Sequence, residues 1–280
     1  MPIKTLVVVL PTIESVAQVM PLAIQIAEDH DAHLVGVHAE ASAITYTGVG
    51  MGFAVQEFAA LRAAEERQTA EIEAAFAAAV AGTGQPTEWR VGEMRGAPSV
   101  ECLLEHAHYA DLVIAPQETP YNGYTPGNQM QEQLVRESGR PVLMVPHAGE
   151  FKSVGKHALV GLSPTRESSR AAFDALDLIA PGAKATILTA HRPSDRDRLP
   201  FDTAKELARS YTRHGIEVTV QDRPDPTLSP GDILLNEAFE RGCDMIVAGA
   251  FGHSRIYDIM VGATTTHLMA HMTAPVLFSA

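Results

Sequence analysis

Apolar residues in this chain are gathered into short runs, and the longer segments between the runs repeat apolar positions with helical spacing. Runs rich in Val, Ile and Leu without polar alternation are typical of strands buried on both faces. Such strands alternating with helices predict a parallel sheet built through right-handed crossovers. The predicted strands fall near residues 4–10, 33–38, 87–91, 112–115 and 142–145, and then near 157–162, 184–190, 216–221, 245–248 and 275–279.

The two halves of the chain repeat one pattern. Asp111-Leu-Val-Ile-Ala recurs as Asp244-Met-Ile-Val-Ala, and a Pro-Val-Leu motif follows 30 positions later at Pro141 and 31 positions later at Pro275. An internal duplication is the simplest explanation. The predicted fold class is therefore α/β, with two tandem open-sheet domains that each have a mostly parallel five-stranded sheet and helices on both faces.

The expected domains are residues 1–148 and 156–280, joined by a polar linker bracketed by glycines. The first copy carries 19 more residues, because the offset between the copies falls from 152 positions at the first strand to 133 at the fourth. These residues belong to 39–82, where Thr45–Gly52 with its three glycines precedes an Ala/Glu-rich amphipathic segment. We interpret this segment as a longer helix packed on the sheet, and a helix that docks a partner is the alternative.

The composition sets limits on the function. A net charge of −13 argues against a general binder of nucleic acid or anionic membranes. No apolar run approaches the roughly 20 residues of a membrane span, and the first apolar run is too short for a signal-peptide core with its cleavage site. The two cysteines, Cys102 and Cys243, exclude a disulfide framework. We therefore expect a cytoplasmic protein with reduced thiols and no membrane span.

A glycine pattern near the end of the chain carries the most specific functional signal. An apolar run leads to Gly249, Gly252 follows, and after nine intervening residues Gly262 precedes a segment with helical spacing. Glycine N–H groups and a helix N-terminus together form a cradle for a phosphate. A purely structural glycine loop is the alternative. The P-loop motif and the Gly-x-Gly-x-x-Gly fingerprint are both missing from the sequence, which disfavours those nucleotide-binding classes.

The spacing Gly249-x-x-Gly252-x9-Gly262, placed after the fourth strand of a repeat, resembles the nucleotide-binding signature of the universal stress protein family. The strand order of both halves extends the resemblance to the whole chain, which looks like a tandem two-domain member. The resemblance implies an adenine nucleotide α-hydrolase-like fold in each half. It also implies ATP or a related adenine nucleotide as the ligand of the second domain, with Mg²⁺ as a companion ion and no prosthetic group.

By this resemblance the nucleotide-binding residues follow the first, second and fourth strands of the second half and open its last helix. They are Gly161, Leu162 and Ser163; Ala190; Ala248, Gly249, Phe251 and Gly252; and Gly262, Ala263, Thr264 and Thr265. Backbone at Ala190 would read the adenine edge, and the missing side chain of Gly249 would let the backbone approach the ligand. Thr264 or Thr265 would cap the helix or bond a phosphate oxygen.

The chain departs from the family pattern at two of these positions. Ala263 stands where Ser or Thr is expected, and Ser163 stands where ATP-binding members commonly have Asp. A neutral hydrogen bond contributes only ~0.5–1.5 kcal/mol net, so the loss of one hydroxyl weakens binding without abolishing it.

The first half lacks the glycine cradle. Its fourth strand leads into Pro116-Gln117-Glu118, where proline has no N–H to donate and Glu118 would repel a phosphate. Asn128 stands opposite Gly262. We therefore expect the first domain to bind no nucleotide in the family's manner. It would bind another small molecule or serve as one half of an internal pseudo-dimer, and a further homodimer stays open.

No convergent acid, base and nucleophile can be named, so no catalytic residue is assigned, although the resemblance leaves slow ATP hydrolysis open. His267 and His271 have metal-ligand spacing on a predicted helix, but no third ligand is evident, and we expect a packing role. Arg255 is a candidate partner for a terminal phosphate, with an exposed loop arginine as the alternative.

The leading hypothesis is a nucleotide-binding stress-response module with an unknown protein partner. The alternative is a nucleotide-independent pseudo-dimeric scaffold or interaction protein. An enzyme of the same broad fold group is a weaker third hypothesis.

Overall fold

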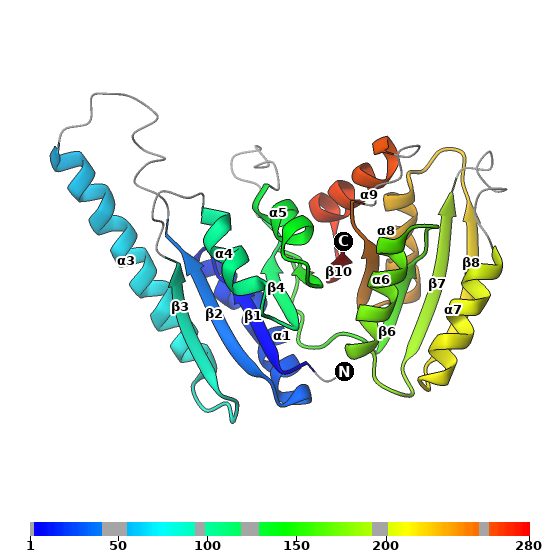
Figure 1. Ribbon diagram of the computed structural model, residues 1–280, viewed down its shortest axis with the longest axis horizontal. Helices are drawn as coiled ribbons and strands as arrows, with labels where there is room; N and C mark the ends of the chain where they lie inside the picture. Colours follow the sequence, from blue (N-terminus) through cyan, green and yellow to red (C-terminus); the bar gives the residue numbers. More distant parts are fainter. Residues whose placement is uncertain (1–2, 41–54, 93–98, 119–128, 192–200, 252–257) are drawn as a thin grey trace. The chain divides into compact units, whose positions relative to one another are not determined.

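The computed structural model describes residues 3–40, 55–92, 99–118, 129–191, 201–251 and 258–280. By its contacts the chain divides into two compact units, 3–116 and 117–280. In both units strands alternate with helices along the chain, as the apolar pattern predicted (Figure 1). The predicted α/β class with a mostly parallel sheet is therefore confirmed.

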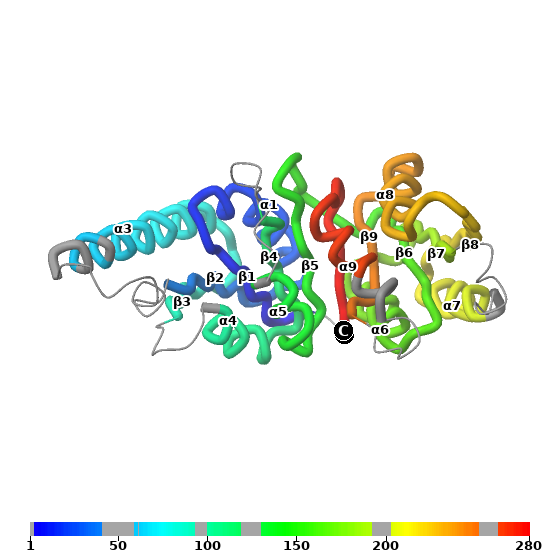
Figure 2. The backbone as a smooth tube through the Cα atoms, turned by 90° about the horizontal axis from the view of Figure 1, so that it is seen from above, coloured from blue at the N-terminus to red at the C-terminus, as the bar shows by residue number. Residues whose placement is uncertain are grey.

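The first unit contains four parallel strands in the order β3-β2-β1-β4. Helices α1 and α3 pack against each other on one face of these strands, and α4 packs on the other face (Figure 2). The elements are β1 (Thr5–Val9), α1 (Ile13–His30), β2 (His33–Ala39), α3 (Val55–Val80), β3 (Thr87–Gly92), α4 (Ser99–Ala107) and β4 (Leu112–Pro116).

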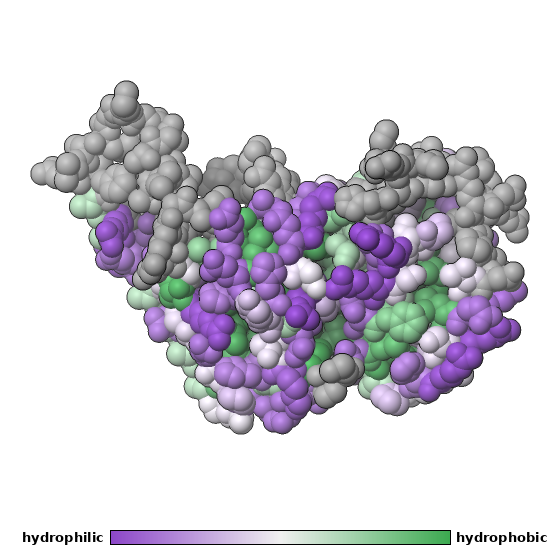
Figure 3. Space-filling view, in the orientation of Figure 1, coloured by the Kyte–Doolittle hydropathy of each residue, from purple (hydrophilic) through white to green (hydrophobic). Residues whose placement is uncertain are grey.

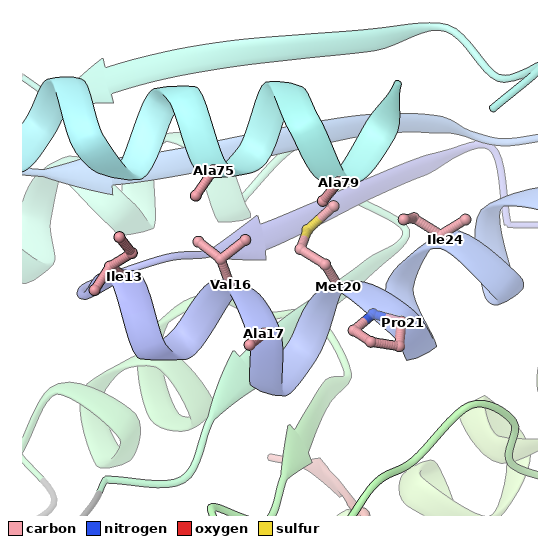
Figure 4. Close-up of a pocket in the computed structure, with 8 residues that line it drawn as sticks. All are labelled: Ile13, Val16, Ala17, Met20, Pro21, Ile24, Ala75 and Ala79. Carbon is pink, nitrogen blue, oxygen red and sulfur yellow. The ribbon is translucent and has the colours of Figure 1, made fainter. Parts of the chain in front are cut away.

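The segment with the additional residues contains α3, a helix of 26 residues, whereas α7 at the equivalent place in the second half has 13. Ile72 and Phe76, which the sequence places on one face, are both buried. The helix packs on α1 and β3, which confirms the packing interpretation. An apolar pocket of about 440 Å³ lies between α1 and α3 (Figure 4), lined by Ile13, Val16, Ala17, Met20, Pro21, Ile24, Ala75 and Ala79. The Thr45–Gly52 stretch lies outside the described residues.

The second unit has the strand order β5-β10-β9-β6-β7-β8. Its strands are parallel except at β5 and β10, which pair antiparallel. The elements are α5 (Gln129–Glu137), β5 (Val142–Val145), β6 (His157–Gly161), α6 (Arg166–Asp174), a short 3-10 helix (Ala175–Asp177), β7 (Lys184–His191), α7 (Phe201–Arg213), β8 (Glu217–Pro224), α8 (Pro230–Arg241), β9 (Met245–Gly249), α9 (Asp258–His271) and β10 (Val276–Ser279).

The duplicated motifs form equivalent local structures. Each repeated aspartate precedes the fourth strand of its half and binds backbone N–H groups at the start of the first strand. Asp111 Oδ2 accepts hydrogen bonds from the N–H groups of Lys4 and Thr5 at 2.8 and 2.9 Å. Asp244 accepts them from residues 155–157 at 2.9 to 3.1 Å. These carboxylates therefore have a structural role, since a charged acceptor stabilises N–H groups that a strand end leaves without a ladder partner.

A Pro-Thr pair also recurs after the first strand of each half, as Pro11-Thr12 and Pro164-Thr165, and it has a local role. Thr12 is the N-cap of α1 and accepts from the N–H of Ser15, while Thr165 is the N-cap of α6 and accepts from the N–H of Ser168. Ser15 and Ser168 are at the N3 positions of their helices, and the N3 N–H is a usual donor to an N-cap hydroxyl. The motif therefore ends the turn after the first strand of each half and starts the next helix.

Among the described residues, no helix is long and apolar enough to cross a membrane. Hydrophilic side chains are interspersed with apolar ones over the face drawn in Figure 3. The large exposed apolar side chains of the described residues come from separate elements, and they are Ile13, Tyr109, Phe173, Leu228 and Phe239.

Candidate functional site

The carboxyl ends of β6 and β9 lie side by side in the second unit, where Gly161 pairs with Ala248. The helices that follow these two strands leave toward opposite faces: α6 lies on the same face as α7, and α9 packs beside α8 (Figures 1 and 2). In open α/β sheets, ligands bind at such a switch point, outside the carboxyl ends of the strands. The residues that the sequence singled out in β6 and β9 therefore meet where this fold class places its ligands.

Both glycines at this edge pack against a helix. A Cβ on Gly249 would lie 2.3 Å from the backbone N of Ser168 in α6, and a Cβ on Gly161 would lie 2.9 Å from Leu234 Cδ2 in α8. The sequence interpretation assigned the missing side chain of Gly249 to ligand approach, and the structure adds a packing reason for it. The space is filled by the first turn of α6, because successive strand residues point to opposite faces and Gly249 points toward that helix.

Hydroxyl groups hold the turn that follows β6. The N–H of Ser163 donates to Ser168 Oγ at 3.0 Å, and Ser163 Oγ lies 3.3 Å from Thr165 Oγ1. The N–H of Leu162 donates to the carbonyl of Leu188 at 2.8 Å. Ser163 is the residue that stands where the resemblance expects an aspartate. Its N–H and hydroxyl groups stabilise the turn that leads into α6.

Strand β7 extends past the end of β6 at Ala190. The carbonyl of Leu188 accepts from the β6 side, whereas the carbonyl of His191 accepts from Asp225 on the β8 side at 3.0 Å. Because backbone groups alternate along a strand, the N–H and C=O of Ala190 point toward the β6 side, beyond the last β6–β7 pair at Gly161 and Leu188. The N–H and C=O of Ala190 therefore point in one direction, in which they could form hydrogen bonds with the edge of a planar ring.

A polar cluster next to Ala190, in which Thr189 and His191 are buried and Asp222 is partly exposed, was missed from the sequence. His191 Nε2 lies 2.9 Å from Asp222 Oδ1, and Thr189 Oγ1 donates to the same oxygen at 2.7 Å. Thr189 and Asp222 are direct neighbours across β7 and β8. No local sequence signal marks this cluster, because its members come together only through the register of the two strands.

Phe251, inside the glycine pattern, has a left-handed backbone conformation with φ of 53°. The preceding N–H, of Ala250, donates to the carbonyl of Ser279 at 2.8 Å, which attaches the start of the loop to β10. The guanidinium carbon of Arg136 lies 3.3 Å above the centre of the Phe251 ring. Gly252 and Arg255 lie outside the described residues.

The start of α9 differs from the sequence expectation. The helix begins at Asp258, so Gly262 lies in its second turn rather than at its entry. Thr264 and Thr265 consequently lie within the helix, and the proposed capping role for them is wrong. Ala263 is exposed and Thr265 is buried, so of these two it is position 263 that is open to the surroundings.

In the first half, the residue that follows β4 has a structural role. The side-chain amide of Gln117 donates to the carbonyls of Met269 and Ala270 in α9 at 2.9 and 3.1 Å, and its oxygen accepts from the N–H of His147 at 3.0 Å. Burial raises the pKa of the neighbouring Glu118 carboxyl, although a hydrogen bond with Gln131 opposes the shift. Residues 119–128, which include Asn128, lie outside the described residues.

The two histidines of α9 are engaged with other side chains. Their rings are 4.6 Å apart, and His267 Nε2 lies 3.0 Å from Asp232 Oδ1 at the start of α8. Hydrogen bonding from Ser229 lowers the pKa of Asp232, and His267 adds to that effect. Within the described ranges, no group of three or more His, Cys, Asp and Glu side chains could hold a metal ion.

Comparison with known proteins places this site in a family context. Residues 155–279 match the universal stress protein family model. A universal stress protein from Archaeoglobus fulgidus shares the fold over 98% of this chain and 95% of its own, with a TM-score of 0.65 and 16% identity. A candidate universal stress protein from Pseudomonas aeruginosa covers 99% of this chain and 93% of its own, with a TM-score of 0.55 and 16% identity.

A functionally unknown protein from Pseudomonas aeruginosa is similar over 99% of this chain and 92% of its own, with a TM-score of 0.53 and 16% identity. No curated protein matches the chain. The predicted resemblance is thereby confirmed for the second half by sequence and for the whole chain by fold. The chain carries a domain of the universal stress protein family at residues 155–279, and over its full length it has the fold of these proteins.

Proposed function

We propose that the carboxyl edge of β6, β7 and β9 binds ATP or a related adenine nucleotide, and that nucleotide occupancy alters contacts with a protein partner in a stress response. The observation that carries this proposal is the switch point between β6 and β9, where the Gly249-x-x-Gly252-x9-Gly262 pattern follows β9. Ala190 supports it, because the backbone N–H and C=O of this residue point past the end of β6 and have the donor and acceptor that an adenine edge requires.

In this proposal the phosphates lie against the backbone after Gly249, and Mg²⁺ is bound through the phosphates. Ser163 has a neutral hydroxyl where the family pattern has a carboxylate, and Ala263 has a methyl group where the pattern has a hydroxyl. The side chains of this protein therefore offer the nucleotide fewer polar groups than the family pattern does. Backbone groups and the α9 N-terminus then supply most of the binding energy. We propose no dedicated catalytic activity, because no side chain of the described residues is assigned as a base.

We also propose that residues 1–148 and 156–280 are the two repeats, arranged as an internal pseudo-dimer. Support comes from the second unit, in which β5 of the first repeat pairs antiparallel with β10 of the second, Val276 opposite Met144. The side chain of Gln117, at the end of the first repeat's β4, reaches the last turns of α9 in the second repeat. Antiparallel pairing of two equivalent edge strands is the arrangement expected of a two-fold contact.

The test is calorimetric titration of nucleotide-free protein with Mg-ATP, ADP and AMP, together with native mass spectrometry of the protein as isolated. Ala263→Ser should tighten binding about twofold to tenfold, because a neutral hydrogen bond to phosphate contributes ~0.5–1.5 kcal/mol. Ala77→Ser, on an exposed position of α3, is the matched control and should change nothing. Absence of binding heat and of any co-purifying adenine compound would reject the proposal and favour a nucleotide-independent scaffold.

A further inference from the structure

A strained residue lies at the start of the proposed nucleotide loop. Among the described residues, Asp31 and Phe251 are the non-glycine residues with positive φ, at 51° and 53°. Asp31 is the C-cap of α1, where a left-handed residue is common. Phe251 follows a strand and caps no helix, so its conformation needs another cause, since a Cβ makes the left-handed region costly.

The contacts of Phe251 identify what compensates for the strain. Its side chain is 7% exposed, and the Arg136 guanidinium lies 3.3 Å above the ring centre. A cation held over an aromatic face is attracted by the ring, by about 0.5–1 kcal/mol at an exposed site, and Arg136 is exposed. Phe251 is thus fixed on two sides, by this cation and by the hydrogen bond from the N–H of Ala250 to Ser279.

The cation comes from the other repeat. Arg136 lies in the last turn of α5, before β5, whereas Phe251 belongs to the second repeat. Helix α5 packs against β10, and Thr266 Oγ1 in α9 donates to Glu132 Oε1 in α5 at 3.3 Å. The second unit therefore holds α5 against β10 and α9 by contacts independent of Arg136.

We propose that Arg136 is a positioning residue for the nucleotide site of the second repeat. It acts through Phe251: the guanidinium holds the ring, and the ring holds the left-handed backbone two residues after the end of β9. The inference rests on the proposed function, because it assigns a first-repeat residue to the same site. The repeats are then functionally linked, and movement of α5 changes the affinity of the site.

The first measurement needs no nucleotide. In protein with labelled phenylalanine, NMR couplings that report the sign of φ are measured at residue 251 in the full chain. Arg136→Met removes the cation and keeps a long apolar side chain, whereas Arg136→Lys keeps a cation. Arg213→Met, in the last turn of α7, is the control for loss of one arginine. Wild type, Arg136→Lys and Arg213→Met should show positive φ, and Arg136→Met should lose it.

The second measurement is nucleotide affinity by calorimetry. Arg136→Met should weaken binding about twofold to fivefold, which is the range expected for loss of one cation–π contact with an exposed cation, while Arg213→Met should leave affinity unchanged. Phe251→Gly takes the left-handed conformation without strain, so adding Arg136→Met to it should have no further effect.

Each outcome decides the inference. Retention of positive φ in Arg136→Met overturns it, whether or not nucleotide binds. Loss of positive φ with unchanged affinity also overturns it, because Phe251 then does not shape the site. If Arg136→Met weakens nucleotide binding as much in the Phe251→Gly protein as in the wild type, Arg136 acts on the ligand directly. That result would overturn the route through Phe251. Wild-type protein that binds no nucleotide rejects the proposed function and the site role, while the couplings still decide whether Arg136 positions Phe251.

Discussion

Replacing Gly249 with alanine tests what this glycine does. The new Cβ would lie 2.3 Å from the N of Ser168 and 2.6 Å from the carbonyl carbon of Glu167, against an ordinary contact distance of 3.4 to 4 Å. Both neighbours are backbone atoms of the first turn of α6, so the helix must move because no side chain can rotate away. Overpacking of this kind costs typically ~1–3 kcal/mol, and we place Gly249→Ala near the upper end.

The alanine also restricts the unfolded chain, which offsets ~0.4–1 kcal/mol of the cost. A net loss of about 2 kcal/mol remains and corresponds to a fall in Tm of roughly 4–8 °C for a unit of this size. The assay is calorimetric melting of the full chain without nucleotide. Gly84→Ala is the control, because a Cβ at Gly84 would meet no atom within 4 Å. A Gly249→Ala protein that melts with wild type but binds nucleotide poorly would refute the packing argument and restore the ligand-approach interpretation.

Three further results are expected. Burial raises the pKa of Glu237, but hydrogen bonds from Arg241 and Arg223 lower it more, so the carboxyl stabilises the fold above pH 4.5 and this stability is lost as the pH falls through its lower folded value. Melting scans should show a deficit for Glu237→Gln that shrinks below that pH, and a constant deficit would contradict the argument. Burial raises the pKa of Cys243 to about 11, so iodoacetamide should modify it only after unfolding; rapid labelling of native protein, seen by mass spectrometry, would contradict this. Asp244→Ala should cost about 2 kcal/mol of unfolding free energy in urea titration and Asp244→Asn about half, since one acceptor oxygen remains; equal losses would show that the charge alone matters.

The elements of the fold could be predicted because their signals are local. The strand predicted at 142–145 is β5, and the one predicted at 245–248 is β9 with one residue more. Burial on both faces requires continuous apolar runs, and those runs are visible in the sequence. Strand β8 was predicted to end at 221 but extends to Pro224, where its polar residues pair with the end of β7. A partly exposed edge strand has no continuous apolar signal, so its end could not be seen.

The candidate site was predicted less completely than the fold. Sequence reasoning selected the segments after β6, β7 and β9, and the structure brings the ends of these strands to one edge of the sheet. It missed Arg136 and the cluster of His191 with Asp222, because both depend on packing between distant parts of the chain. It also misplaced the start of α9, where the glycine was taken as the helix entry and the helix begins four residues earlier, at Asp258.

The sequence by itself determined the α/β class, the duplication with its repeated Pro-Thr pairs, whose threonines cap helices in the structure, and the glycine spacing that resembles a family signature. These features follow from periodicity and from short-range hydrogen bonds, which operate within a few residues. The tertiary structure decided that β5 pairs antiparallel with β10, that Gly249 leaves room for α6, and that a first-repeat cation lies over Phe251. Each of these depends on which surfaces meet after the chain has folded, and sequence spacing alone does not encode that contact.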